Sequence, residues 1–107
     1  MYENKNAGKI IELKNSINYQ DDSIVSKTFI EKITGTVTVF AFDKGQSLSE
    51  HTAPFDALVN ILDGKAEITI AQKPFILQAG EMIIMPANVA HSLRAIEKFK
   101  MMLVMIK

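Results

Sequence analysis

The sequence predicts an all-β protein built as one small sandwich or barrel. Its 107 residues suit one domain, residues 1–107, which can bury about 60 to 70% of its unfolded surface. Turn-forming pairs recur roughly every 8 to 12 residues, with β-branched runs between them. No long helical periodicity competes with this pattern. The turns are Thr34-Gly35, Lys44-Gly45, Asp63-Gly64, Lys73-Pro74, Ala79-Gly80 and Pro86-Ala87-Asn88.

The expected strands lie in order between these turns. A short apolar run, residues 9–13, predicts an edge strand in an amino-terminal segment, residues 1–22, whose last part is polar enough to form a loop. The β-branched runs that follow are separated by the turns and have strand lengths. They predict strands at 24–33, 36–43, 57–62, 65–71, 74–77, 81–85, 90–95 and 98–106.

Asp63-Gly64 is a strong hairpin signal, because Asp-Gly suits a two-residue turn between antiparallel strands. It predicts that residues 57–62 pair with residues 65–71. Apolar and polar side chains alternate along 65–71, so one face of that strand should pack inward. The last strand, 98–106, is apolar on both faces, which is typical of a strand covered on both sides.

Alternation also predicts where the chain's two histidines point. Successive strand residues face opposite sides of a sheet. His91 shares a face with Leu93 and Ala95, and His51 shares its parity with Ala53 and Ala57. Both histidines are therefore expected to point into the barrel.

Composition excludes several classes of function. Twelve basic and twelve acidic residues cancel, and neither sign forms a run, which argues against nucleic-acid and membrane partners. The absence of cysteine excludes disulfides, thiolate metal sites and a thiol nucleophile. No apolar leader or membrane-length stretch is present, so a cytoplasmic location is expected.

The two histidines lie in two segments that begin with glycine and have regular spacing. The first runs Gly45, five residues, His51, one residue, Ala53, three residues, Ala57, six residues, Gly64. The second runs Gly80, five residues, Pro86, one residue, Asn88, two residues, His91, three residues, Ala95.

These spacings resemble the two motifs of the cupin superfamily, whose small, single-domain (cupin 2 type) members are β-barrels of this length. The resemblance covers residues 45–95, about half of the chain, and implies a jelly-roll barrel, also called a double-stranded β-helix. In the family, the first motif carries two histidines and a glutamate and the second carries a third histidine. Here Ala53 and Ala57 stand at two of these four positions, so the metal motif is degenerate. Asn88 and Ala95 stand where the family's second motif has glycine and asparagine.

The family pattern brings three imidazoles and one carboxylate to a divalent first-row metal. Only His51 and His91 are left, and two nitrogens alone make a weak, poorly selective site. In a regular strand, Glu50 and Asp56 would point to the face opposite His51. We therefore expect no required cofactor, with a weakly bound divalent transition metal on the two histidines as the alternative.

Two alanines in place of larger ligands should leave an apolar space inside the barrel. A small, mostly apolar molecule would fit there, with the histidines as polar anchors. The residues expected to line this pocket are His51, Ala53, Ala57, Val59, Met85, His91 and Leu93, with Met105 as a further candidate.

Three functions are consistent with this sequence. The first is a small-molecule-binding module with a partly lost metal site. The second is a cupin enzyme of the lyase, isomerase or dioxygenase type, acting through His51 and His91 with or without a weakly held metal. The third is a structural or interaction domain without a ligand. A homodimer that covers open strand edges is also expected.

Overall fold

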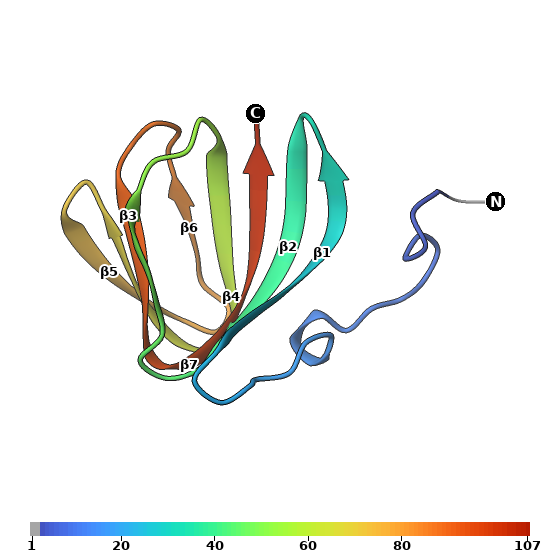
Figure 1. Cartoon of the computed structure of the whole chain (residues 1–107), viewed down its shortest axis with the longest axis horizontal. Helices are drawn as coiled ribbons and strands as arrows, with labels where there is room; N and C mark the ends of the chain where they lie inside the picture. Colours follow the sequence, from blue (N-terminus) through green and yellow to red (C-terminus); the bar gives the residue numbers. More distant parts are fainter. Residues whose placement is uncertain (1–2) are drawn as a thin grey trace.

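The computed structural model describes residues 3–107, and its regular elements are almost all antiparallel strands (Figure 1). The amino-terminal segment predicted at residues 1–22 includes Met1 and Tyr2, which lie outside the described residues. One short 3-10 helix, η1 (Leu13–Asn15), precedes the strands. The strands are β1 (Ile24–Lys32), β2 (Gly35–Phe42), β3 (Ser47–His51), β4 (Asp56–Ile70), β5 (Lys73–Gln78), β6 (Met82–Met85) and β7 (His91–Ile106).

Two long strands organise the barrel. The strand order is β1-β2-β7-β4-β5, with β3 added beside β7 and β6 beside β4. Half of β4 and half of β7 lie with β1, β2 and β6, while their other halves lie with β3 and β5. The two walls fold toward each other as an open cup (Figure 1). This is the all-β jelly-roll architecture that the sequence predicts.

The core lies between the two walls, where the inward residues of each strand meet. Alternation along β4 buries Ala57, Val59 and Ile61 in one half and Ala66 and Ile68 in the other, as the sequence predicts. The Phe42 ring from β2 stacks on the Phe99 ring from β7 with centroids 4.5 Å apart. Stacked aromatic pairs of this kind stabilise a core beyond the area that they bury.

The predicted hairpin at Asp63-Gly64 is wrong. Residues 57–62 and 65–71 belong to one strand, β4, and do not pair with each other. Gly64 has a φ of +79° at a register shift between β4 and β7, which identifies a β-bulge. A Cβ on Gly64 would lie 1.9 Å from the Lys98 carbonyl oxygen, so glycine is required for close approach as well as for its φ.

The same bend merges the two predicted strands at 90–95 and 98–106 into β7, which has 16 residues. The tight turn follows β4 instead. Ala71 and Gln72 have φ values of +49° and +69° between the paired residues Ile70 and Lys73. Positive φ at both central residues is the type I′ pattern, for which these residue types give no sequence signal.

The predicted edge strand at residues 9–13 is also wrong. This stretch forms no strand, and η1 begins at its end. The amino-terminal segment instead covers part of the outer sheet face, where Ile17 packs with Val39 and Ala41 in a second small core. The apolar side chains of this segment are buried against the face of the sheet, so its backbone forms no strand at the sheet edge.

A polar cluster attaches this segment to the barrel. The Tyr19 hydroxyl donates a hydrogen bond of 2.6 Å to an Asp63 carboxylate oxygen. Burial, followed by this contact, raises the pKa of Tyr19, and the hydrogen bond from Tyr19 lowers the pKa of Asp63. The buried Lys100 ammonium donates to the Lys14 carbonyl oxygen at 2.7 Å and lies 5.0 Å from the Tyr19 ring centroid. A cation over an aromatic face is stabilised by the quadrupole of the ring.

Candidate functional site

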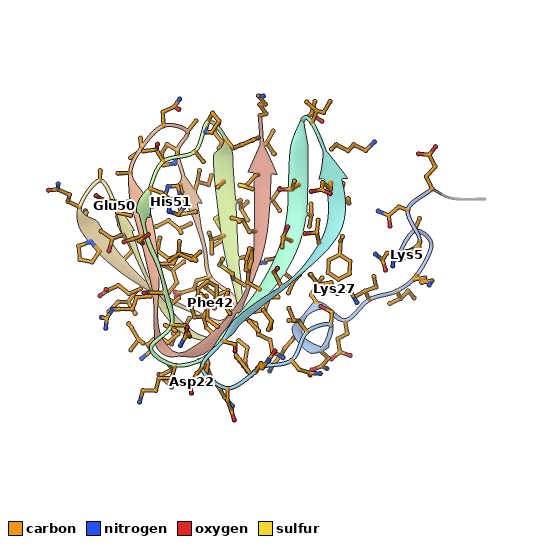
Figure 2. All side chains as sticks on the ribbon, in the orientation of Figure 1. Lys5, Asp22, Lys27, Phe42, Glu50 and His51 are labelled. Carbon is orange, nitrogen blue, oxygen red and sulfur yellow. The ribbon has the colours of Figure 1, made fainter. Side chains whose placement is uncertain are left out.

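The two histidines meet at the open end of the cup. His51 ends β3 and His91 begins β7, and the two are paired across these antiparallel strands. The His91 side chain is buried, with 5% of its surface exposed, whereas His51 lies at the exposed rim. Figure 2 shows His51 beside Glu50 on β3. The sequence analysis did not predict β3, because four of the five residues in Ser47–His51 are polar. In the structure only Leu48 of this strand is half-buried.

The two imidazoles face each other through their outer nitrogens. The Nε2 atom of His91 lies 3.1 Å from the Nε2 atom of His51. The ring centroids are 4.4 Å apart, and the ring planes meet at 69°. Parity therefore predicts the meeting of the two side chains correctly, although only His91 is buried.

Backbone carbonyls determine which ring nitrogen of each histidine carries the proton. The Nδ1 atom of His51 lies 2.7 Å from the Ser49 carbonyl oxygen, and the Nδ1 atom of His91 lies 3.1 Å from the Val89 carbonyl oxygen. A carbonyl oxygen can only accept, so each Nδ1 carries the proton and donates it. In the neutral rings both Nε2 atoms then present lone pairs to each other. A hydrogen-bond donor or a positive charge placed next to the two Nε2 atoms would stabilise this arrangement.

Behind the histidines lies a small apolar cavity of about 60 Å³. The smallest space that holds one water is about 10 to 15 Å³, so this cavity admits a few non-hydrogen atoms. Three of its lining residues are methionines, whose flexible side chains can adjust to a guest. The lining residues are Leu48, His51, Ala53, Ala57, Met85, His91, Leu93, Met101, Leu103 and Met105.

The structure brings together six of the seven residues expected to line the pocket. Val59, the seventh, is fully buried in the core and does not line the cavity. Met105, the further candidate, also lines the cavity, and Met101 and Leu103 are additional lining residues. These residues share the parity of His91 along β7. The sequence predicted two separate strands there, 90–95 and 98–106, so the alternation was not extended from His91 to the second strand. Leu48 lacked a signal because β3 was not predicted.

Asn88 explains one departure from the motif spacing. It stands where the family pattern has glycine and has a φ of +64°. Asparagine tolerates the left-handed region better than most non-glycine residues. Its backbone N–H donates to the Ala53 carbonyl oxygen at 2.8 Å, which ties the two motif segments together at the cavity. The substitution therefore keeps the local backbone shape.

The donor set does not fit a tightly held metal. Two nitrogens bound at about 2.0 to 2.1 Å to one metal lie about 2.9 to 3.4 Å apart, so the histidine pair alone has suitable spacing. However, residues 3–107 contain no cluster of three or more His, Cys, Asp or Glu side chains that could hold a metal ion. Asp56 is exposed, and its carboxylate accepts from the Ala87 N–H at 3.0 Å. Glu50 is exposed as well.

The fold and this site define a small jelly-roll barrel with an interior pocket flanked by residues of both glycine-bounded segments. A family model described as the cupin domain matches residues 38–107. The chain therefore belongs to the cupin domain family, in agreement with the resemblance of its motifs. In the part of the chain that the structure describes, no helix has the length and hydropathy to cross a membrane.

Several solved structures are similar to this chain. A conserved Streptococcus pyogenes protein of unknown function is 39% identical, with a TM-score of 0.92 over 97% of this chain and 91% of that chain. A cupin 2 conserved barrel domain protein from Leptotrichia buccalis is 42% identical, with a TM-score of 0.83 over 85% of this chain and 44% of that longer chain. A cupin superfamily protein from Desulfitobacterium hafniense shares the fold at 24% identity, with a TM-score of 0.87 over 92% of this chain and 91% of that chain. No curated protein matches this chain.

Proposed function

We propose that this protein is a metal-independent small-molecule-binding module whose ligand enters the cavity behind His51 and His91. The observation that carries the proposal is the pair of Nε2 atoms 3.1 Å apart at the mouth of the cavity. Two acceptors that converge on one point favour a ligand with a hydrogen-bond donor, such as a hydroxyl. Leu93, Met85 and the alanines around the cavity favour an apolar body of a few carbon atoms.

Ala53 and Ala57 are central to this proposal. They stand where the family pattern places metal ligands, and both line the cavity. Each alanine removes a donor and leaves space for carbon atoms. The same two substitutions that weaken a metal site therefore favour an apolar guest.

Phenol and toluene are matched probes for this site, because toluene carries a methyl group where phenol carries a hydroxyl. Each has seven non-hydrogen atoms, so either one must displace the flexible methionine side chains that line the cavity of about 60 Å³. Both should perturb the methyl resonances of Met85, Met101 and Met105, since these side chains line the cavity. We expect phenol to bind about fivefold more tightly, as one hydrogen bond contributes about 1 kcal/mol. His51→Ala with His91→Ala should remove that preference and leave toluene binding in place.

Ser92→Ala is the matched control, because Ser92 neighbours His91 on β7 with the opposite parity. It should keep the preference for phenol. Equal affinities for the two probes in the natural protein would contradict the proposal. So would a stoichiometric transition metal in the purified protein, measured by elemental analysis.

An enzyme of the lyase or isomerase type is the second candidate, favoured by the exposed His51 ring, whose Nε2 is free of a backbone partner and can accept a proton. A dioxygenase is disfavoured by the incomplete donor set. The double histidine variant also tests this candidate. If the variant folds and retains full turnover of an identified substrate, the histidines have no catalytic role. The cytoplasmic location and the homodimer stay predictions.

A further inference from the structure

The inner face of the wall that contains β1, β2 and β6 carries a row of side chains in register across five strands. Strand pairing aligns Glu31 of β1 with Thr36 of β2, Thr36 with Met105 of β7, Met105 with Ala57 of β4, and Ala57 with Met85 of β6. We call these five residues the inner row. Its last three members line the cavity behind the histidines. The inner row therefore continues from the cavity to two polar residues.

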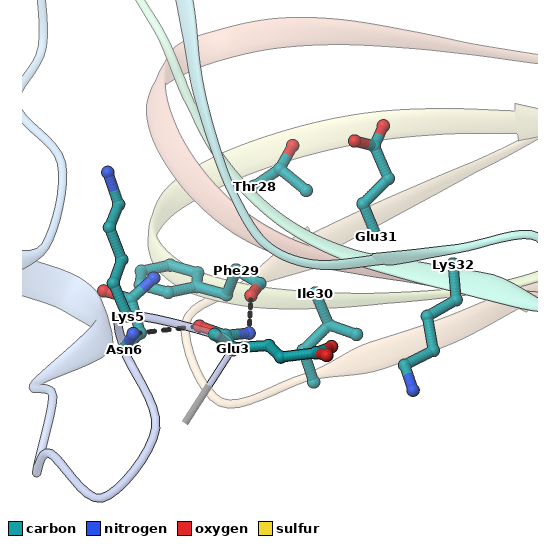
Figure 3. Close-up of a pocket in the computed structure, with 9 residues that line it drawn as sticks. Glu3, Lys5, Asn6, Thr28, Phe29, Ile30, Glu31 and Lys32 are labelled. Carbon is teal, nitrogen blue, oxygen red and sulfur yellow. Dashed lines mark hydrogen bonds between the residues drawn. The ribbon is translucent and has the colours of Figure 1, made fainter. Parts of the chain in front are cut away.

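A β-bulge places Glu31 on this inner face. The register between β1 and β2 shifts between Thr28 and Ile30. Thr28 and Glu31 therefore lie on the same side of β1, although residues three apart in a regular strand face opposite sides. Figure 3 shows these two side chains on one side of β1 and the side chains of Ile30 and Lys32 on the other. Glu31 is exposed, so its carboxylate is open to solvent beside the inner row.

The hydroxyl of Thr36 lacks a partner inside the protein. Thr36 has the parity of Phe42, which packs in the core between the walls, so it faces inward. Its hydroxyl oxygen is the one buried side-chain oxygen or nitrogen in residues 3–107 without a hydrogen-bond partner. By contrast, the hydroxyl oxygens of Thr28 and Thr38 lie 3.2 Å apart as a pair. Burial of an unpaired hydroxyl costs free energy, so such a group is a candidate contact for a ligand.

Met105 separates the Thr36 hydroxyl from the cavity. Cross-strand partners such as Thr36 and Met105 have Cβ atoms about 4.5 to 5.5 Å apart. Met105 is half-buried, and a methionine side chain is unbranched and flexible. A ligand that displaces this side chain extends beyond the cavity by one strand spacing, about 4.8 Å, and reaches Thr36.

We propose that Thr36 and Glu31 form a second polar subsite, which selects a ligand that carries an ammonium group at the end opposite its hydroxyl. This inference rests on the proposed function, because the histidine pair holds the hydroxyl end. At the second subsite an ammonium N–H donates to the Thr36 hydroxyl oxygen, and the Glu31 carboxylate supplies the opposite charge. The ligand class is therefore a small hydroxyamine with an apolar body.

Tyramine and 4-ethylphenol test this subsite, because tyramine is 4-ethylphenol with a terminal amino group. In isothermal titration of the full chain at neutral pH, tyramine should bind about tenfold more tightly, as expected for one charge-assisted hydrogen bond. Thr36→Val and Glu31→Gln should each reduce this preference to about threefold or less. Circular dichroism verifies that both variants fold.

Thr69→Val and Glu50→Gln are the matched controls. Thr69 lies on β4 between positions whose side chains face the core, so it has the outward parity. Glu50 is exposed on β3 beside His51. Both control variants should keep the preference for tyramine. A preference that is lost in Glu50→Gln and kept in Glu31→Gln would overturn the proposed subsite.

Thermal unfolding of the ligand-free protein gives a second measurement. Thr36→Val should keep or raise the thermal midpoint, because it removes an unpaired buried hydroxyl. Thr38→Val should lower the midpoint by a few degrees, because it breaks the contact with Thr28. An equal fall in both variants would overturn the proposal, since the Thr36 hydroxyl would then have a structural partner.

The two probe pairs separate this inference from the proposed function. Equal affinities for tyramine and 4-ethylphenol, in a protein that still prefers phenol over toluene, would overturn the second subsite alone. A tyramine preference that survives both Thr36→Val and Glu31→Gln would do the same. A protein that binds none of the four probes would overturn the second subsite together with the proposed function.

Discussion

At the scale of single residues, the site depends on four positions. His51 and His91 supply acceptor nitrogens, each oriented by a backbone carbonyl two residues earlier in the chain. Ala53 and Ala57 line the cavity beside them without donating any ligand. Orientation of imidazoles by carbonyls is also how proteins prepare metal ligands. The histidine geometry therefore suits a metal, and the two alanines remove the remaining donors.

Restoring those donors should create a metal site. Ala53→His with Ala57→Glu is expected to bind Zn²⁺ or Ni²⁺ at least about 100-fold more tightly than the natural protein, a gain of about 2.7 kcal/mol. Without metal the variant should be less stable, because Ala57 is buried and glutamate adds volume and charge there. Added metal should raise its thermal midpoint.

Isothermal titration and thermal unfolding measure the two effects. Ala53→Gln with Ala57→Gln is the control, since it adds similar volume without imidazole or carboxylate. A folded Ala53→His, Ala57→Glu variant that binds no more metal than this control would show that the four positions do not converge.

At the scale of elements, the barrel depends on strands that bend without ending. Gly64 lets β4 continue from one wall to the other, and β7 follows it through a register shift at the same place. The same dipeptide, Asp63-Gly64, would close a hairpin in another context. Here the backbone of β7 approaches Gly64 so closely that a side chain has no room.

Gly64→Ala should therefore destabilise the protein by about 3 kcal/mol or more, because it combines a positive φ with a backbone clash. Gly45→Ala is the control. Gly45 has a φ of +85°, and a Cβ added there would meet nothing within 4 Å, so this variant should lose only about 1 to 2 kcal/mol. Urea unfolding of both variants measures the difference. Equal losses would mean that the close approach to β7 contributes nothing.

At the scale of the whole molecule, the amino-terminal segment connects to the barrel through the cluster of Tyr19, Asp63, Lys14 and Lys100. The hydrogen bond from Tyr19 is the first cause of the lowered pKa of Asp63, and the Lys14 and Lys100 charges contribute further. Asp63 lies at the bulge of β4. One carboxylate therefore links the bulge of β4 to the amino-terminal segment.

This cluster predicts how stability depends on pH. A carboxyl group whose pKa is lowered by folding stabilises the folded state above its unfolded value, here 3.8, and this contribution is lost as the pH falls through the folded pKa. Asp63→Asn should cost roughly 1 kcal/mol at pH 7, discounted for partial exposure. The difference from the natural protein should shrink below about pH 4.

Urea unfolding at pH 7 and at about pH 3, on either side of the usual aspartate pKa, measures this difference. Asp21→Asn is the control, because Asp21 is an exposed aspartate on the same segment. A loss for Asp63→Asn that stays the same at both pH values would indicate that the carboxylate charge is not involved.

The sequence alone was sufficient for the fold class, the inward side of most strands and the meeting of the two histidines. These follow from alternation and from glycine spacing, which are local properties of the chain. It also predicted six residues that line the cavity. Strand β3 and the cavity residues Leu48, Met101 and Leu103 were missed, because they depend on which strands pair and how far each one continues.

Only the tertiary structure decided whether Asp63-Gly64 would turn or bulge, because its backbone can do either and the approach of β7 selects the bulge. It also decided that the Nε2 atoms of His51 and His91 face each other at 3.1 Å. Alternation determines which face of a strand a side chain occupies. Register between strands that are distant in sequence determines which side chains become neighbours, and that register is set by packing of the whole barrel.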